Sequence, residues 1–425
     1  MNSKSSFSDR SADKRSDSNG PAGVNGMRVL LLFPHMIMPG GALNYMLKLA
    51  EILTGNGATV GILTLQVDQQ RYGRNAGAQL LNVGGPVTSS LGYWLLHPFW
   101  QMKISRIIRE WQPDVLIPQV FPANWWAWLY KRHNKGARIV WVCQEPSAFI
   151  HSRNWIDALQ PFWKKYLARA LNPLLARLDI RLSRFSDKII ANSNFTAGTI
   201  ERVYNRKADA IAYPAIDFHQ FHPEANVEKQ EALVTVAKLS RFKRVDFLLR
   251  VFSLVLKQHP RLVYHIVGRG EDEVKLKTLA RELNVSANVI FHGGLSNEQL
   301  AALHRRSLLF LHGSIEEPFG MAPLEAIACG TPVIAHKSGG PLEFVDDSCG
   351  RLIDSLAAEE WSEQICNFLT TIKQQAGYFD QVSDCARRFT WESTLSPILH
   401  IIQQFKTGPV AYTHLNQDED SAEGQ

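Results

Sequence analysis

The run GSIEEPFGMAPLEAIACGTPVIA, residues 313–335, decides the fold of this chain. An apolar stretch ends at His312 just before it, and a polar loop then carries Glu316 and Glu317. Helix-like spacing follows as far as Gly330, and a second short apolar stretch begins at Thr331. Strand, loop, helix and strand in this order predict a βαβ unit, which places two parallel strands in one sheet.

Similar apolar runs of strand length occur on both sides of this unit, with helical patterns between most of them. The earlier series comprises Arg28–Phe33, Thr59–Leu65, Asp114–Ile117, Ala137–Cys143 and Asp187–Ala191, and the later series comprises Ala232–Leu239, Leu262–Val267, Asn288–His292, Ser307–His312, Thr331–Ala335 and Arg351–Ile353. The break between the series falls near Tyr213-Pro214. We therefore predict an α/β protein with two doubly wound, Rossmann-like domains that face each other across a cleft.

Length and composition agree with two domains. The chain has 425 residues, of which 45% are apolar and 20% charged, so a disordered protein or a disulfide scaffold is excluded. We expect a disordered arm over residues 1–26 and a disordered acidic tail over 406–425. The two domains are expected over 27–213 and 214–388. The five cysteines are odd in number and form no C-x-x-C, which indicates buried free thiols in a reducing compartment.

The net charge of +6 is unevenly distributed. Between Tyr93 and Lys188 there are 15 Lys and Arg against 6 Asp and Glu, a local charge of +9 that leaves −3 elsewhere. The same segment holds nine of the eleven tryptophans. A dedicated nucleic-acid binder would be more uniformly basic, so no nucleic-acid partner is expected. No apolar leader and no run of 18 apolar residues occurs, which favours a cytoplasmic protein.

Two carboxylates flank the predicted helix start at Phe319-Gly320. Glu317 precedes the helix and Glu325 lies within it. Carboxylates suit vicinal hydroxyls, because each can accept two O–H bonds, and a glycine at a helix start lets an anion approach the backbone. The alternative is that Glu317 caps the helix and Glu325 lies on a solvated face.

Cations gather where another strand of the later series ends. Lys238 closes the strand, and Lys243 and Arg244 precede the next helix. At the carboxyl edge of a parallel sheet these charges could neutralise a diphosphate. A basic loop in water is the alternative.

A glycine pair, Gly268 and Gly270, follows the next strand. It begins like a dinucleotide fingerprint, but position 273 is Glu instead of the third glycine. An oxidoreductase that binds NAD(P) is therefore disfavoured, although NAD(P) binding would test it.

With these motifs, the chain resembles the family-four retaining glycosyltransferases of the GT-B fold over residues 27–405, most strongly over 232–353. The most specific motif is two glutamates separated by seven residues, Glu317 and Glu325, followed by AIACGTPVIA. The resemblance implies a nucleotide-sugar donor on the C-terminal domain and a helix over 389–405 that crosses back to the N-terminal domain.

The resemblance also implies roles for single residues. Glu317 would face the hydroxyls of the donor sugar and Glu325 the ribose, with backbone from Phe319, Gly320 and Met321 near the sugar and diphosphate. Lys243 matches the phosphate-binding lysine of the family, and Gly268 and Gly41 belong to loops beside the donor. Lys238 stands where an arginine is usual, which keeps the charge but loses the bidentate fork.

The identity of the donor sugar and the role of the N-terminal edge are predicted from more detailed sequence similarities. Lys243–Asp246, Ser338–Glu343 and Ala191–Ala197 are similar to stretches of mannosyltransferases that use GDP-mannose, although a UDP-hexose stays possible. Relatives often carry a histidine where this chain has Gln144. Gln144 cannot act as an acid or base but can hydrogen-bond a sugar, so a non-catalytic, nucleotide-sugar-binding subunit remains an alternative.

The resemblance implies same-face chemistry, in which the departing phosphate oxygen helps to deprotonate the acceptor. The protein then needs charge at the diphosphate and orientation of the sugar. No D-x-D occurs in the donor region, so no metal or other cofactor is expected.

The basic, tryptophan-rich segment suits an anionic membrane surface. We therefore expect a peripheral protein that acts on a lipid-linked or glycan acceptor in envelope polysaccharide synthesis. The alternative is that the tryptophans pack in the core.

Overall fold

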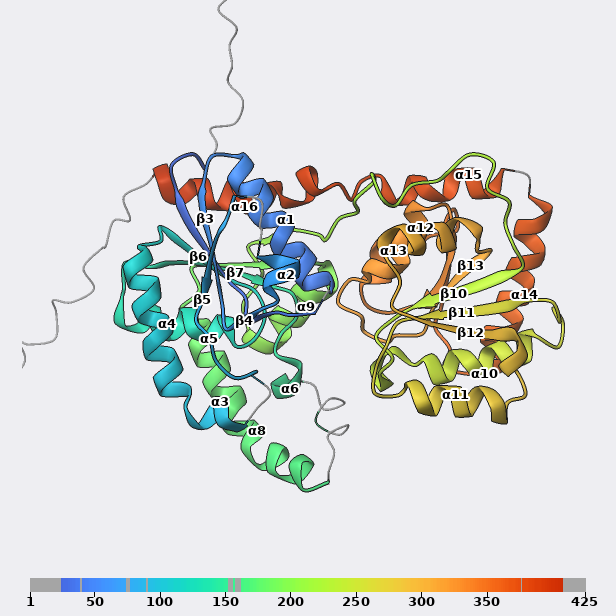
Figure 1. Ribbon diagram of the computed structural model, residues 1–425, viewed down its shortest axis with the longest axis horizontal. Coiled ribbons are helices and arrows are strands. Elements are labelled where there is room, and N and C mark those ends of the chain that lie inside the picture. Colours follow the sequence, from blue (N-terminus) through green and yellow to red (C-terminus); the bar gives the residue numbers. More distant parts are fainter. Residues whose placement is uncertain are drawn as a thin grey trace, which may run out of the picture.

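The computed structural model describes residues 24–38, 40–73, 77–88, 91–151, 156, 162–375 and 377–407. Residues 1–23 of the predicted arm and 408–425 of the predicted tail lie outside these ranges, as does Pro39. The arm and the tail are each shorter than predicted, because Val24 is buried in the core and the last helix continues to Thr407. Two parallel sheets, each with helices on its faces, form two bodies that lie side by side (Figure 1). This arrangement confirms the predicted α/β class.

The N-terminal sheet has seven strands, all paired in parallel. In spatial order they are β5 (Gln79–Asn82), β3 (Thr59–Thr64), β1 (Arg28–Leu32), β6 (Val115–Pro118), β7 (Arg138–Cys143), β8 (Lys188–Ala191) and β9 (Ala210–Ile211). A short parallel pair, β2 (His35–Met36) with β4 (Gln66–Val67), lies beside it. The edge strands β5 and β9 were not predicted, because neither is a continuous apolar run.

Helices connect these strands. They are α1 (Gly41–Gly55), α2 (Gln69–Tyr72), α3 (Leu91–Leu95), α4 (His97–Trp111), α5 (Ala123–His133), α6 (Ala148–His151), α8 (Phe162–Ser183) and α9 (Asn194–Tyr204). Helix α5 packs against both α4 and α8, which leaves its residues little access to water.

The C-terminal sheet has six parallel strands at the predicted places. In spatial order they are β12 (Val289–Gly293), β11 (Val263–Val267), β10 (Ala232–Val236), β13 (Leu309–His312), β14 (Val333–His336) and β15 (Gly350–Ile353). Their helices are α10 (Val245–Val255), α11 (Glu273–Glu282), α12 (Asn297–Arg306), α13 (Met321–Ala328) and α14 (Ala358–Gln374), with 3₁₀ turns η1 (Arg241–Lys243), η2 (Ser286–Asn288) and η3 (Gly340–Glu343).

Within the described residues, three further elements follow: α15 (Tyr378–Val382), the 3₁₀ turn η4 (Ser383–Ala386) and α16 (Trp391–Thr407). Figure 1 shows α15 on the C-terminal body and α16 along the N-terminal body. Helix α16 contacts α1 and β9 there, and Tyr45 of α1 stacks edge-on against Trp391. The last helix therefore ties the two bodies together.

Candidate functional site

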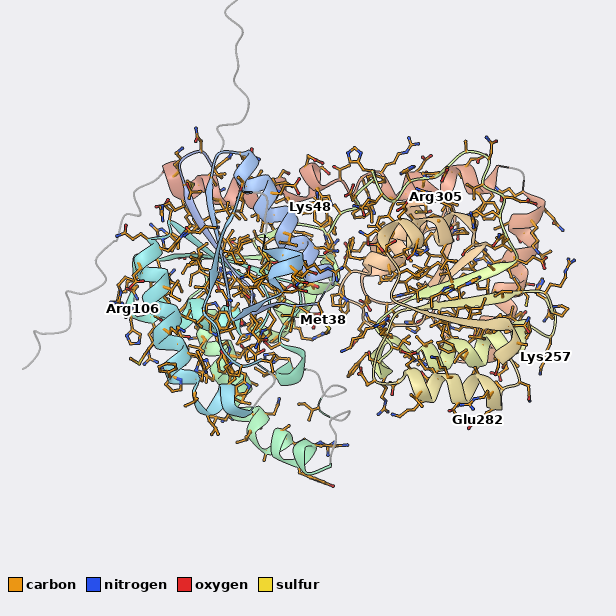
Figure 2. The ribbon with its side chains drawn as sticks, viewed as in Figure 1. Met38, Lys48, Arg106, Lys257, Glu282 and Arg305 are labelled. Atoms are coloured by element: carbon orange, nitrogen blue, oxygen red, sulfur yellow. The ribbon has the colours of Figure 1, made fainter. Side chains whose placement is uncertain are left out.

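The loops after β1 and β8 meet the loop after β13, so the carboxyl edges of the two sheets face each other. A Cβ added to Gly41 would lie 3.4 Å from Cγ of Met321, the first residue of α13. Ser193 Oγ, after β8, donates a hydrogen bond to the carbonyl of Pro318. Met38, labelled in Figure 2, lies on the same side of the N-terminal body. Ligands of doubly wound sheets bind at such edges, which makes this boundary the candidate site.

An ion pair between Lys243 and Glu317 stands at the centre of this site. Lys243 Nζ lies 2.7 and 2.5 Å from the two carboxylate oxygens of Glu317. The turn η1 after β10 carries the lysine, and the loop after β13 carries the glutamate. Burial alone would raise the pKa of Glu317, but Lys243, with help from His312 and Ser314, lowers it below its usual range. Glu317 is therefore ionised at neutral pH.

His312 ends β13 beside this pair, with its Nε2 3.9 Å from Glu317. Burial lowers the pKa of His312 to about 4, although Glu317 opposes the shift. The imidazole is therefore neutral at pH 7, and a neutral imidazole can donate or accept a hydrogen bond without adding charge.

Glu325 lies on α13, half-buried, and differs from Glu317 in having no cation beside it. Its carboxylate has no hydrogen-bond or ion-pair partner among the residues that the structure describes. Burial raises the pKa of Glu325 to about 8. A carboxyl group in this environment has free acceptor capacity for ligand hydroxyls.

The backbone between these carboxylates is fixed by glycines. Gly320 has a φ of 101° and precedes α13. Gly340 donates its N–H to the carbonyl of Glu317, 2.7 Å away, and a Cβ there would lie 2.0 Å from the carbonyl of Phe319. The Ser338-Gly-Gly turn therefore supports the loop that carries Glu317.

Phe319 does not offer its ring to the site. The ring is buried and packs against Tyr213, Phe344 and Phe389. Only its backbone remains as a candidate ligand group, as expected.

The backbone conformation and close packing at Gly268 require a glycine. Its φ is 130°, and a Cβ would lie 1.9 Å from the carbonyl of Ala237. Gly270 approaches the carbonyl of Leu239 equally closely, at 2.1 Å. Both glycines thus let the loops after β10 and β11 pack together, a reason for Gly-x-Gly that needs no dinucleotide.

Lys238 lies at the mouth of the site. Its side chain is 68% exposed and pairs with Glu271 at 3.9 Å. Strand β10 ends at Val236, two residues before this lysine. Water screens a charge in this position much more than it screens that of Lys243.

Amide side chains line the facing edge of the N-terminal sheet. Gln144 is buried and donates from Nε2 to Gln119 Oε1 at 3.3 Å, and Asn192 Nδ2 donates to the Gln144 carbonyl and Oε1 at 2.8 and 3.2 Å. Gln119 Nε2 and Asn192 Oδ1 have no partner among the described residues. Gln144 therefore belongs to an amide cluster that can still bind a ligand hydroxyl.

Glu145, next to Gln144, is a candidate that the sequence analysis missed. Its side chain is exposed and lies near enough to Glu317 and Lys243 for their charges to affect its pKa. Burial and then the charge of Glu317 raise its pKa, while Lys243 opposes the shift. The three groups thus interact across the boundary between the bodies. Its place directly after a predicted strand was the available signal.

Two family comparisons bear on this arrangement. The model described as "Glycosyltransferase Family 4" matches residues 39–220, and that described as "Glycosyl transferases group 1" matches residues 217–377. Their boundary falls between the two sheets. The chain belongs to these glycosyltransferase families.

Curated relatives of this family member match only in part. The chain is 30% identical over 231 residues to a D-inositol 3-phosphate glycosyltransferase of Segniliparus rotundus, and 26% over 240 residues to that of Saccharomonospora viridis. These matches cover 50% and 52% of the chain and 51% and 56% of the relatives. The chain thus spans about half the length of the curated relatives it matches.

Solved structures share the GT-B fold with this family member over most of its length. A sucrose-phosphate synthase from Thermosynechococcus elongatus has a TM-score of 0.73 at 17% identity, covering 89% of this chain and 99% of that one. Anabaena HepE, solved with UDP and glucose, has a TM-score of 0.71 at 18% identity, covering 89% and 100%. At these identities the likeness shows the fold, which confirms the expected GT-B class.

Two of the stretches that resemble mannosyltransferases touch each other in this family member. Asn194 donates from its N–H and Nδ2 to the two carboxylate oxygens of Glu343, each at 2.7 Å, and Phe195 N–H lies 3.3 Å from one of them. A carboxylate at the start of α9 is favoured by the free N–H groups there. Because Asn194 and Glu343 come from different bodies, these two residues form a clasp between the bodies.

The tryptophans of the basic segment mostly pack inside. Trp111, Trp125, Trp126, Trp128 and Trp141 are buried, while Trp94 and Trp100 are half-buried. Trp155 and the side chain of Trp163 lie outside the part of the chain that the structure describes. The expectation that these aromatic rings form a membrane interface is wrong for the buried five, because all five lie in one hydrophobic core of the N-terminal body. No helix in the described ranges is both long and apolar enough to cross a bilayer.

Proposed function

We propose that this chain transfers a hexosyl group from a nucleotide-sugar to an acceptor hydroxyl with retention of configuration. The observation that carries the proposal is the Lys243–Glu317 pair at the carboxyl edge of the C-terminal sheet. A lysine held by a carboxylate beside a helix start is poised to exchange that partner for a phosphate.

The exchange would release both oxygens of Glu317. Glu317 would then accept hydrogen bonds from the donor sugar, Glu325 from the ribose, and Lys243 would stay on the diphosphate. As the sugar–phosphate bond breaks, charge builds on the leaving phosphate, where Lys243 and the N–H groups of α13 stabilise it. The leaving oxygen can take the proton of an acceptor hydroxyl that the facing edge orients.

The donor base and the acceptor need a direct experiment. HepE, of the same fold, was solved with UDP-glucose, and the relatives are inositol-phosphate glycosyltransferases by name. We propose a hexose donor, with GDP-mannose and UDP-hexoses as the first candidates, and a lipid-linked, glycan or inositol-phosphate acceptor. A screen of GDP-, UDP- and ADP-sugars against these acceptors should give transfer with one donor, and no transfer or donor hydrolysis with any pair would contradict the proposal.

The reaction is proposed to need no catalytic metal. Activity in EDTA should equal activity with added Mg²⁺ or Mn²⁺. Loss of activity in EDTA that either of these ions restores would contradict metal-free catalysis.

A non-catalytic subunit that binds a nucleotide-sugar is the second candidate. The buried Gln144, which cannot exchange a proton, favours it. The same screen separates the two, because such a subunit would bind the donor and neither hydrolyse nor transfer it.

We further propose that the N-terminal body docks on an anionic membrane surface, on the cytoplasmic face. The support is a set of exposed apolar side chains on α3, α4, α8 and the residue between α3 and α4: Leu95, Leu96, Phe99, Met102, Leu171, Leu174 and Leu178. Arginines and lysines accompany them, among them Arg106, which points outward from α4 in Figure 2. Apolar side chains among cations suit a headgroup region.

Vesicle flotation tests this docking. Phosphatidylglycerol vesicles at low salt should float the protein, and the double variant Phe99→Ser and Leu174→Ser should float much less. Leu356→Ser, an equally exposed leucine on the other body, is the matched control. Flotation unchanged in the double variant, or absent in the parent chain, would contradict the docking.

A further inference from the structure

Three groups outside the candidate site converge on the C-terminal body, shortly before α16 begins. Asp346 follows η3, Cys349 directly precedes β15, and Cys385 lies in η4. Their ligand atoms all lie within 4.8 Å of one another. Asp346 Oδ1 is 3.8 Å from Cys349 Sγ and 3.6 Å from Cys385 Sγ. Both cysteines are free thiols.

These separations match those of zinc ligands. With Zn–S bonds of about 2.3 Å and Zn–O bonds of about 2.1 Å, a tetrahedron places oxygen and sulfur about 3.6 Å apart and two sulfurs about 3.8 Å apart. The two measured oxygen–sulfur distances therefore need little movement to accept an ion. Two thiolates with one carboxylate favour zinc over magnesium or calcium, which prefer all-oxygen sites.

The surroundings give such an ion access and support. Cys349 is buried, Cys385 is half-buried and Asp346 is exposed, so the cluster opens on one side. A surface pocket lined by Asp346, Asp384, Cys385 and Arg388 lies on that side. Ser348 donates from N and Oγ to Asp346 Oδ1 at 2.9 and 2.5 Å, and so orients the carboxylate.

We propose that Asp346, Cys349 and Cys385 bind a zinc ion whose fourth position faces the pocket and takes water. Binding releases the two thiol protons. The ion would join the loop before β15 to η4, which contacts α13 and leads into α16. It would thus stiffen the support of the donor-binding helix, in a role separate from the transfer chemistry, and the inference does not depend on the proposed function.

Cobalt titration of the full chain, reduced and stripped of metal, tests the site. One equivalent of Co²⁺ should give a thiolate-to-cobalt charge-transfer band that zinc abolishes. The band should be lost in Cys385→Ser and in Cys349→Ser, and Asp346→Asn should weaken cobalt affinity at least tenfold. Cys366→Ser, a buried thiol on α14, should leave the band unchanged.

Three outcomes would overturn the proposal. They are no charge-transfer band in the parent chain, a band that survives in both Cys385→Ser and Asp346→Asn, and a band lost equally in Cys366→Ser. Because Cys385 and Asp346 lie toward solvent, these two variants should fold, which circular dichroism checks. A parent chain that binds no cobalt but loses two thiols to a peroxide would instead show a disulfide pair.

Discussion

The two sheet edges that face each other at the candidate site differ in their chemistry. The C-terminal edge presents an ion pair, Lys243 with Glu317, and a second carboxyl group, Glu325, on the following helix. The N-terminal edge presents neutral amides, Gln144 and Asn192, and one carboxylate beside them, Glu145.

The difference supports the proposed placement of the two substrates. A diphosphate and a polar sugar need fixed charges and strong acceptors, which the C-terminal edge supplies. An uncharged hydroxyl needs orientation more than charge, and amides that both donate and accept can provide it. Under the proposed function, the donor would bind the C-terminal body and the acceptor the N-terminal body.

The largest effect is expected at Glu317. Glu317→Gln removes the charge that holds Lys243 and one acceptor for the sugar, so kcat/KM for transfer should fall by about 100-fold or more. Steady-state kinetics measure it, and Glu316→Gln, an exposed neighbour, should change little. A rate for Glu317→Gln within threefold of the parent would remove Glu317 from the site.

The two lysines should differ in nucleotide binding. Lys243→Gln deletes a half-buried charge and should weaken nucleoside diphosphate binding about 30-fold. Lys238→Gln deletes a solvent-screened charge and should weaken it about threefold or less. Calorimetry on both variants checks the ranking, and equal effects would show that the ion pair does not mark the diphosphate position.

Glu145 tests the N-terminal edge, where we expect the acceptor to bind. Glu145→Gln should leave the donor dissociation constant within about twofold and lower the transfer rate about tenfold, because it acts on the acceptor side. Donor binding and transfer are measured on the same sample. If donor binding falls as much as transfer does, Glu145 belongs to the donor site.

The raised pKa of Glu325 predicts a pH dependence. At pH 7 the carboxyl is mostly neutral, so nucleotide affinity should rise about tenfold as the pH passes from 7 to 9 through the pKa of about 8. Calorimetry in a pH series measures this rise, and Glu325→Gln should abolish it. The same rise in Glu325→Gln would assign the titration to another group.

The contribution of Glu325 to the free energy of unfolding should fall, not rise, as the pH increases. The pKa of Glu325 is higher in the folded than in the unfolded chain, so its contribution to the free energy of unfolding is fully present below about pH 4. The contribution is lost as the pH rises toward 8. Urea unfolding of the parent and Glu325→Gln compares the two slopes.

The smallest effect concerns the clasp between the bodies. Glu343→Gln removes a carboxylate from the start of α9 and should lower the free energy of unfolding by about 1–2 kcal/mol. Urea unfolding measures it, with Glu360→Gln in the first turn of α14 as control. Equal stability of the two variants would show that the clasp contributes little.

The sequence predicts the fold well, because parallel strands buried on both faces appear as continuous apolar runs. It also locates Glu317 and Glu325, since a polar loop between strand and helix is visible locally. The ion pair itself joins residues 74 positions apart, so no local pattern could reveal it.

What the sequence did not predict also has a physical reason. The run Asn124-Trp-Trp-Ala-Trp128 has cations beside it in the sequence, but α4 and α8 both pack against α5, and the run is buried. Ser193 and Asn194 contact Pro318 and Glu343 of the other body, and their positions in the sequence could not reveal these contacts. Burial and domain contacts depend on the tertiary arrangement, which sequence spacing does not contain.

A crystal structure with a bound nucleotide-sugar tests the central claim most directly. We predict that Lys243 Nζ leaves Glu317 and lies within hydrogen-bond distance of a phosphate oxygen, while Glu317 accepts from the sugar hydroxyls. A structure in which Lys243 and Glu317 stay paired, with the nucleotide bound elsewhere, would contradict the account.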